Sequence, residues 1–258
     1  MNNITQVAST IASLLGIRTV AGTAPLGEVC SLLPGGRADR VLMYNPDAVA
    51  WWLFEKYREI FAPVLDRTGA ILRMESVMPS VTPVCFASMY SGVMPEVHGI
   101  RAYVKPVLTC ETIFDIAIAN GIRPAICSTG TDSISMIFRE REMDYFIFNT
   151  PAEVNAKVRE LMAADSHRLI VAYNGDYDTT MHKFGPESKE ALDVLRLNVA
   201  VYRELCEYAE TAWGAKGLSY AAAFATDHGC HEIDGGCGSH GLDMPEDMNV
   251  IHLWTAGK

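Results

Sequence analysis

The stretch Ser80-Val81-Thr82-Pro83-Val84-Cys85-Phe86-Ala87-Ser88-Met89-Tyr90-Ser91-Gly92 combines the start signal, apolar body and stop signal of a short helix. Thr82 can cap the helix with its side-chain oxygen, Pro83 suits the first helical position, and Gly92 suits the end. A helix N-terminus presents free N–H groups and partial positive charge, which favour an alkoxide at Thr82 and the phosphoryl oxygens that it would attack. Taken alone, the stretch favours an ordinary capped helix, so residues elsewhere in the chain decide between a cap and a nucleophile.

Short apolar strands alternate with helices from Arg40 onward. The strands are predicted at residues 41–44, near 71, and at 124–128, 145–148, 169–173, 221–225 and 250–254. The helices are predicted within 48–66, in the stretch quoted above, near 112–120, and at 152–164 and 189–213. This alternation predicts an α/β fold, a three-layer α/β/α sandwich in which helices cover both faces of a mostly parallel sheet. Ligands of such sheets bind beyond the carboxyl ends of the strands.

A single domain is predicted for residues 1–258, because no repeat, low-complexity tract or clear linker divides the chain. Residues 4–16 carry apolar side chains at helical spacing, which predicts a surface helix within an N-terminal helical appendage of residues 1–36. The core is expected over residues 37–258. An extra helix packed on the domain is favoured over a helix that binds a partner or a second copy.

The charge balance limits the classes of partner. With 21 basic and 31 acidic residues the formal net charge is −10, which disfavours nucleic-acid polymers and anionic membranes but leaves room for a small substrate. The seven cysteines are scattered through apolar segments, which is typical of a reducing compartment. Residues 4–15 lack the basic flank of a signal peptide, and no apolar run approaches the roughly 20 residues that span a bilayer. We therefore expect a cytoplasmic protein.

Carboxylates and imidazoles follow several of the predicted strands or lie in nearby loops. These candidate metal ligands are Asp47, Asp178, His182, Asp227, His228 and His240. Asp178 and His182 are four residues apart, so one helical turn would place them on the same face. Two histidines with a carboxylate and an open position are a common catalytic zinc arrangement. Each residue alone is more typical of a helix cap or a turn, but together they predict one site at one edge of the sheet.

A rival metal site would use Cys230, His231, Cys237 and His240 as ligands of a structural zinc ion. Its spacing lacks the paired Cys-x-x-Cys arrangement, so we favour the catalytic site. The remaining histidines have no acidic or thiol partner at a useful spacing and are interpreted as structural or surface residues: His98, His167 and His252.

The sequence resembles the alkaline phosphatase superfamily over about residues 40–258, particularly its type I phosphodiesterase and nucleotide pyrophosphatase-like branch. The motifs that carry the resemblance, in the order of that family, are Val41–Asp47; Pro79–Pro83 with Ser91-Gly92, Pro95 and His98-Gly99-Ile100; Thr112–Asp115; Asp178–His182 with Gly185-Pro186; Thr226–Gly229; and His240-Gly241. The resemblance implies an alkaline phosphatase-like fold with a minimal cap, because the large inserted cap domains of many relatives are absent.

The resemblance also implies a mechanism. Two metal ions, usually zinc, would flank the Thr82 nucleophile, which would form a covalent phospho-threonine that water then hydrolyses. The ligands implied for one ion are Asp178, His182 and His240, and those for the other are Asp47, Asp227, His228 and the Thr82 oxygen. Zinc is favoured, with manganese or iron as alternatives, because the ligands mix carboxylates and imidazoles.

Two positions depart from the pattern. Cys85 stands where relatives often carry an asparagine that binds the phosphate, so we expect the phosphate to be oriented differently here. Ala48 follows Asp47 where relatives usually have glycine. Residues 101, 103 and 105 could reach a phosphate, although solvated surface is the favoured interpretation of Arg101, Tyr103 and Lys105.

The expected function is hydrolysis of a small-molecule phosphate ester, either a phosphodiester or a phosphomonoester. Phosphonate hydrolysis and phosphomutase activity stay open, and sulfatase activity is disfavoured because sulfatases use a modified Cys or Ser where this chain has Thr82. The alternative from another class is a noncatalytic metal-binding or ligand-sensing domain on the same scaffold. The natural substrate and the oligomeric state stay open.

Overall fold

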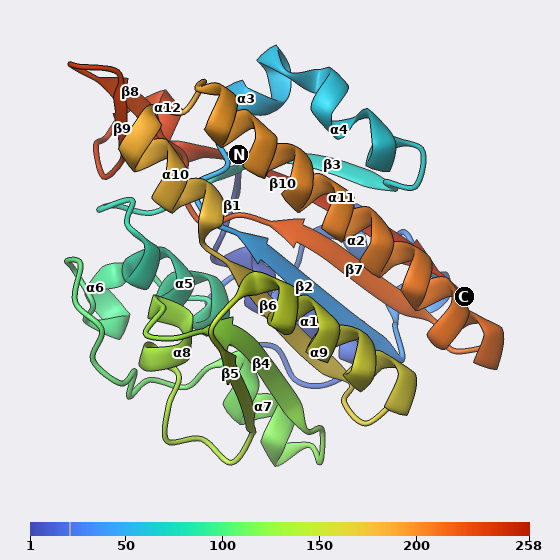
Figure 1. The fold of residues 1–258 in the computed structure, drawn as a ribbon. Helices are drawn as coiled ribbons and strands as arrows, with labels where there is room; N and C mark the ends of the chain where they lie inside the picture. The colour runs from blue at the N-terminus through green and yellow to red at the C-terminus, as the bar shows by residue number, and fades with distance from the viewer. Residues whose placement is uncertain (21) are drawn as a thin grey trace.

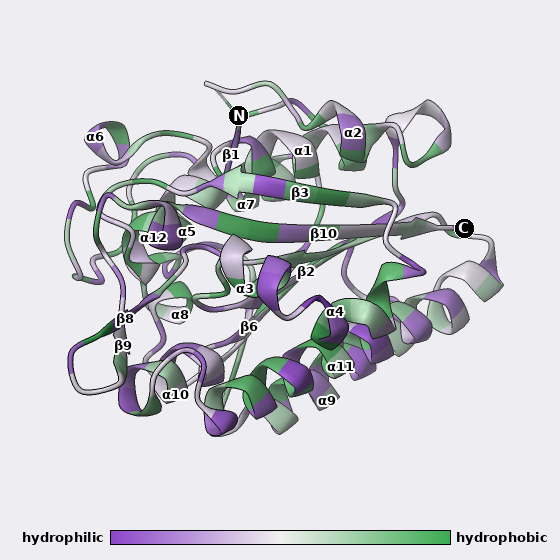
Figure 2. Ribbon diagram, turned by 90° about the horizontal axis from the view of Figure 1, so that it is seen from above, coloured by the Kyte–Doolittle hydropathy of each residue, from purple (hydrophilic) through white to green (hydrophobic). Residues whose placement is uncertain are grey.

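An eight-stranded sheet lies between two layers of helices in the computed structural model, which describes residues 1–20 and 22–258 (Figures 1 and 2). In spatial order the strands are β1 (Asn2–Asn3), β3 (Ala70–Glu75), β10 (Asn249–Gly257), β7 (Tyr220–Ala225), β2 (Arg40–Pro46), β6 (Leu169–Asn174), β4 (Pro124–Thr129) and β5 (Asp144–Phe148). Neighbouring strands are parallel except at β10, which is antiparallel to both β3 and β7. The predicted three-layer α/β/α fold with a mostly parallel sheet is confirmed.

Alternating side chains of the central strands fill two separate cores. In β2, Val41 and Met43 face one core while Leu42 and Tyr44 face the other, and all four are fully buried. One core is covered by α1 (Gln6–Leu15), α5 (Thr82–Ser91), α7 (Ile113–Ala119) and α8 (Ser133–Ile137). The other is covered by α3 (Trp51–Lys56), α4 (Arg58–Leu65), α9 (Pro151–Ala164), α10 (Asp176–Phe184) and α11 (Lys189–Ala212). The short helices α2 (Gly27–Cys30), α6 (Pro95–His98) and α12 (Pro245–Met248) lie in the connections.

The predicted strands and helices are present, and their bounds shift by a few residues. The region 48–66 differs, because α3 and α4 are two helices that meet at Tyr57, whose backbone is non-helical at φ −116° and ψ 44°. The glycine-rich loop after β7 contains an unpredicted hairpin, β8 (His231–Ile233) and β9 (Cys237–Ser239).

The prediction of a surface helix near the N-terminus is wrong. Eight of the ten residues of α1 are buried, and Asn2 and Asn3 add the strand β1 to the edge of the sheet beside β3. Polar residues of α1 are buried as well, namely Ser9 and Thr10. Thr10 donates its hydroxyl to the carbonyl oxygen of Gln6 (2.7 Å) and accepts from the N–H of Leu26 (2.9 Å). Such local bonds let Ser and Thr be buried at little cost.

Among the described residues, every helix is too short or too polar to cross a membrane.

A core role for α1 can be tested with Ile11, which is fully buried. We expect Ile11→Ala to lower the free energy of unfolding by about 2–5 kcal/mol, since the truncation leaves a cavity. Ile147→Ala is the matched control, because Ile147 is 40% exposed and should lose about 1 kcal/mol or less. Urea unfolding followed by circular dichroism measures the free energy of unfolding of both variants. Equal small losses would instead support the prediction that α1 is an appendage.

Candidate metal centre

Thr82 does not cap α5, contrary to the prediction. The N-cap is Val81, Thr82 is the first helical residue, and no side chain caps this end. The Thr82 hydroxyl is therefore free for other contacts, and it lies 3.2 Å from Nε2 of His228 and 3.4 Å from Oδ2 of Asp47. The helix ends at Gly92, in the left-handed conformation (φ 74°) that glycine favours.

Three of the candidate ligands form a first group around Asp178 at the start of α10. Its Oδ1 lies 3.3 Å from Nε2 of His182, one helical turn later, and 3.5 Å from Nε2 of His240, which follows β9. Ligand atoms from these three residues lie within 4.8 Å of one another, which is close enough to share one ion.

A second group gathers around His228 directly after β7. Its Nε2 lies 3.2 Å from Oδ1 of Asp47 and 3.5 Å from Oδ2 of Asp227. Asp178 also comes within 4.8 Å of the ligand atoms of Asp47 and His228, so it joins the two groups. The imidazoles of His228 and His240 stack with ring centroids 4.0 Å apart. The structure thus brings together all six predicted protein ligands and the Thr82 hydroxyl.

Backbone carbonyls orient the three imidazoles in the same way. Nδ1 of His182 bonds the carbonyl of Gly238 (2.9 Å), and Nδ1 of His240 bonds that of Ser80 (2.9 Å). Nδ1 of His228 bonds the carbonyl of Gly229 (3.0 Å). Because a carbonyl oxygen only accepts, each Nδ1 carries a proton, and each Nε2 faces the carboxylates as the atom available to a metal ion. A protonated Nδ1 with such a contact is typical of metal-ligating histidines.

The carboxylates of the centre lack any balancing charge in the protein. Oδ1 of Asp47, Oδ1 of Asp178 and Oδ2 of Asp227 are buried and accept no hydrogen bond. Burial, and then the charge of Asp178, raises the pKa of Asp47; burial, and then the charge of Asp47, raises the pKa of Asp227. No ion pair in residues 1–20 and 22–258 joins a Lys or Arg to these three residues. Divalent cations fit this arrangement of oxygens and imidazole nitrogens.

Tyr173 contacts Asp47, which no sequence pattern predicts. Its hydroxyl donates to Oδ2 of Asp47, and burial raises the pKa of Tyr173 so that it keeps its proton. In the sequence it is one of the apolar residues of a buried strand, and only the parallel pairing of β6 with β2 brings it to Asp47.

Ala48 adopts the left-handed backbone conformation at φ 63° that its position requires. Glycine reaches this conformation without strain, whereas an L-residue pays about 1–2 kcal/mol. The glycine of relatives is thus replaced here by a strained alanine rather than by a different turn.

Cys85 does not border the centre in the way that its sequence position suggested. The side chain is fully buried, and its Sγ contacts Oγ of Ser76 (3.2 Å) and the carbonyl oxygen of Val77 (3.8 Å). We therefore expect no contact between Cys85 and a substrate.

The three residues that follow the Thr82 motif and are predicted as solvated surface differ in their contacts. Arg101 donates to the carbonyl of Glu96, and Lys105 donates to that of Thr131. Burial, and then the charges of Asp47 and Asp178, raises the pKa of Tyr103, so Tyr103 is the residue of the three that lies in the field of the centre.

The rival zinc site does not assemble among the described residues. His231 bonds Asp247 through Nδ1 (2.7 Å), and His240 is turned toward Asp178. Neither group of potential ligands includes a cysteine. The structural interpretation of the other histidines agrees with their places in the core, where each forms a hydrogen bond: His98 with Ser88, His167 with Asp144 and His252 with the carbonyl of Thr226.

Comparison with known proteins gives matches in structure alone. No known sequence family and no curated protein matches the chain. The fold is similar to that of murine ectonucleotide pyrophosphatase/phosphodiesterase 5 (17% identity, TM-score 0.59), over 76% of this chain and 58% of that one. The human protein of the same name matches at 16% identity and a TM-score of 0.59, over 76% and 58%. The chain thus spans a little over half the length of these proteins.

A second kind of neighbour is the C-terminal periplasmic domain of the phosphoethanolamine transferase EptC from Campylobacter jejuni. It matches at 14% identity and a TM-score of 0.63, over 86% of this chain and 80% of that domain. Both kinds of neighbour have the fold of the alkaline phosphatase superfamily. The resemblance drawn from the motifs is confirmed at the level of the fold.

The ligand groups predict which residues retain metal. After reconstitution with Zn²⁺, His240→Ala and Asp227→Ala should each lower the bound metal measured by elemental analysis, because each removes a ligand from a different group. His231→Ala is the matched control and should leave the metal content unchanged. Loss of metal in the control and in His240→Ala, with unchanged stoichiometry in Asp227→Ala, would favour the rival site, because His240 is a ligand of both sites.

The uncompensated carboxylates predict a gain of stability on neutralisation. In metal-free protein, Asp227→Asn should raise the free energy of unfolding by about 1–3 kcal/mol, because a neutral amide replaces a buried charge. Excess Zn²⁺ should reverse the order, since the wild type binds metal more tightly. Urea midpoints with and without Zn²⁺ measure both effects; a variant that is less stable in both conditions would contradict the idea.

Proposed function

We propose that this chain is a metal-dependent phosphoric ester hydrolase, a phosphodiesterase or phosphatase, that acts through a covalent phospho-threonine at Thr82. The observation that carries the proposal is the free Thr82 hydroxyl at the start of α5, within 3.4 Å of two candidate metal ligands. A cap would have used this oxygen for the helix, whereas here it faces the centre.

Two metal positions follow from the two groups of ligands. Asp178, His182 and His240 would hold one ion, and Asp47, Asp227, His228 and the Thr82 oxygen would hold the other. When bound, two divalent ions would lower the pKa of the Thr82 hydroxyl and neutralise the phosphoryl oxygens, and the mixed carboxylate and imidazole ligands favour zinc.

The chain itself positions the nucleophile and the phosphoryl group. Val84 and Cys85 both donate their N–H groups to the carbonyl of Val81, and Pro83 has none. Thr82 therefore carries the free N–H of this helix end, adjacent to its own hydroxyl, and can donate it to a phosphoryl oxygen. Tyr173 holds the Asp47 carboxylate in place from the other side.

The reaction divides into two displacements at phosphorus. The Thr82 oxygen attacks, the bond from phosphorus to the ester oxygen breaks, and the alcohol leaves with a proton. Water then attacks the phospho-threonine, which regenerates the Thr82 hydroxyl and releases the phosphate product. Both displacements therefore take place at the same site around Thr82.

The neighbours support this class of chemistry. Murine ectonucleotide pyrophosphatase/phosphodiesterase 5 has been solved as an inactive threonine-to-alanine variant in complex with AMP. A threonine is thus essential in a protein of similar fold, which supports the role assigned to Thr82. The match to a phosphoethanolamine transferase favours a second candidate, in which a hydroxyl of another molecule replaces water in the second displacement.

The alternatives predict different substrates. A phosphonate hydrolase would turn over phosphonate esters in preference to phosphate esters. A noncatalytic metal-binding or ligand-sensing domain would bind metal through the same residues and turn over neither. A small phosphate ester in the cytoplasm stays our expectation for the natural substrate.

Thr82→Ala should lower kcat by at least about 10³-fold on the best substrate, because the attacking oxygen is lost. Rates are compared on bis(4-nitrophenyl) phosphate, 4-nitrophenyl phosphate and a matching phosphonate after reconstitution with Zn²⁺ or Mn²⁺. Cys85→Ala lies in the same helix and is the matched control, with a rate expected within about threefold of the wild type. A Thr82→Ala variant that keeps a near wild-type rate would overturn the covalent mechanism, and no turnover by the wild type would favour the noncatalytic domain.

A further inference from the structure

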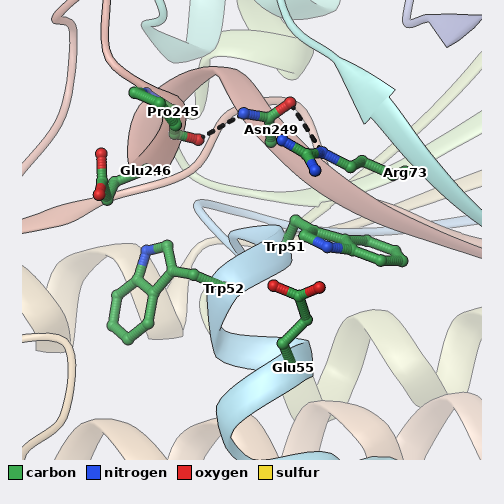
Figure 3. Close-up of a pocket in the computed structure, with 7 residues that line it drawn as sticks. All are labelled: Trp51, Trp52, Glu55, Arg73, Pro245, Glu246 and Asn249. Carbon is green, nitrogen blue, oxygen red and sulfur yellow. Dashed lines mark hydrogen bonds between the residues drawn. The ribbon is translucent and has the colours of Figure 1, made fainter. Parts of the chain in front are cut away.

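A second site lies between α3, α12 and the adjoining ends of β3 and β10 (Figure 3). It is a pocket of about 110 Å³ and shares no lining residue with the metal centre. Its lining residues are Trp51, Trp52, Glu55, Arg73, Pro245, Glu246 and Asn249. Five of these are aromatic or charged, namely Trp51, Trp52, Glu55, Arg73 and Glu246, and the proposed function uses none of them.

The aromatic walls are fixed by contacts with the rest of the fold. Trp52 donates its Nε1–H to the carbonyl of Cys230 (2.8 Å). Trp51 packs against Phe54 with ring centroids 5.2 Å apart. By contrast, Nε1 of Trp51 is buried and has no acceptor. A water molecule barely reaches this atom, so Trp51 contributes its ring rather than its N–H to the pocket.

Opposite charges face the pocket without neutralising each other. Arg73 is oriented by a bond from its Nε to Oδ1 of Asn249 (3.1 Å), and Asn249 is held in turn by the carbonyl of Pro245 (2.8 Å). The two terminal nitrogens of Arg73 remain as donors. Glu55 projects its carboxylate between the two indoles, across the pocket from Arg73 (Figure 3). Within the described part of the chain, neither residue takes part in an ion pair.

We propose that this pocket binds a small zwitterion that carries both a carboxylate and an ammonium group, as a free amino acid does. The carboxylate accepts from the terminal nitrogens of Arg73, as charge-assisted hydrogen bonds favour. The ammonium lies against Glu55 and the faces of the indoles, which attract cations. A simple anion would leave Glu55 without a partner, and a simple cation would leave Arg73 without one.

The size of the pocket limits the ligand. Since a water molecule occupies about 30 Å³ of liquid, 110 Å³ holds about four water molecules or a ligand core of roughly five or six heavy atoms. Glycine, with five heavy atoms, has this size, and the N-methyl groups of glycine betaine would extend beyond it. A longer side chain would extend into solvent, because Glu55 and Arg73 are exposed.

Binding can be measured on the whole chain by calorimetry and by the fluorescence of Trp51 and Trp52. The probes are glycine and glycine betaine, compared with acetate and tetramethylammonium, which each carry one of the two charges. Both zwitterions should bind about ten- to a hundredfold more tightly than either single-charge probe, as expected from one extra charge-assisted contact.

Three variants separate the proposed contacts. Arg73→Gln and Glu55→Gln should each weaken the binding of glycine about tenfold or more. Trp51→Leu should weaken it by removing an aromatic face. Glu59→Gln is the matched control, because Glu59 is exposed outside the pocket, and it should change nothing. Each variant is checked for its fold by circular dichroism.

Any one of the following outcomes would overturn the proposal. Acetate binding as tightly as glycine would identify an anion site, and tetramethylammonium binding as tightly would identify an aromatic cation site. Absence of binding by all four probes to folded protein, or equal loss in Glu59→Gln, would remove the site. None of these outcomes depends on hydrolase activity.

Discussion

The repulsion among three carboxylates, two fully buried and one partly buried, is the constraint on which this molecule depends. Asp47, Asp178 and Asp227 converge where no lysine or arginine of the described chain reaches them, and each keeps an oxygen without a hydrogen bond. Proteins do not bury such charges for stability, because desolvation outweighs what neighbouring dipoles return. The rest of the centre follows from this constraint: imidazoles with Nε2 facing the carboxylates, a tyrosine that donates to Asp47, and a hydroxyl held at a helix start.

The order of the strands produces this convergence. β7, β2 and β6 are consecutive neighbours in the sheet, and their carboxyl ends lead to Asp227, Asp47 and Asp178 respectively. The three carboxylates are far apart in the chain, yet they follow three adjacent strands, with Asp47 on the middle one, and neighbouring strands lie about 4.8 Å apart. A sheet in which another strand separated β2 from β7 would divide the centre in two.

Much of the fold and the candidate ligands could be predicted from the sequence, because both depend on local patterns. Buried parallel strands are continuous apolar runs, and a polar residue directly after such a run lies at the ligand-binding edge. The errors arose where tertiary contacts override local signals. In α1, Thr10 bonds the backbone and is buried, and at α5 the helix begins at Thr82 rather than after it. Tyr173 and the pocket beside Trp51 depend on pairings between distant segments, which no local pattern encodes.

The place of β10 in the sheet has a consequence for folding. This strand, the last in the chain order, lies between β3 and β7, so β1 and β3 reach the other strands only through it. Its pairing with β3 joins residues such as Glu75 and Asn249, and such distant partners slow folding because a long loop must close first. Until β10 pairs with β7, β7 exposes an open edge of six otherwise buried residues, Tyr220–Ala225. Nascent or truncated chains that lack β10 therefore present an apolar strand ready to pair with another chain, and aggregation competes with the closing of the sheet.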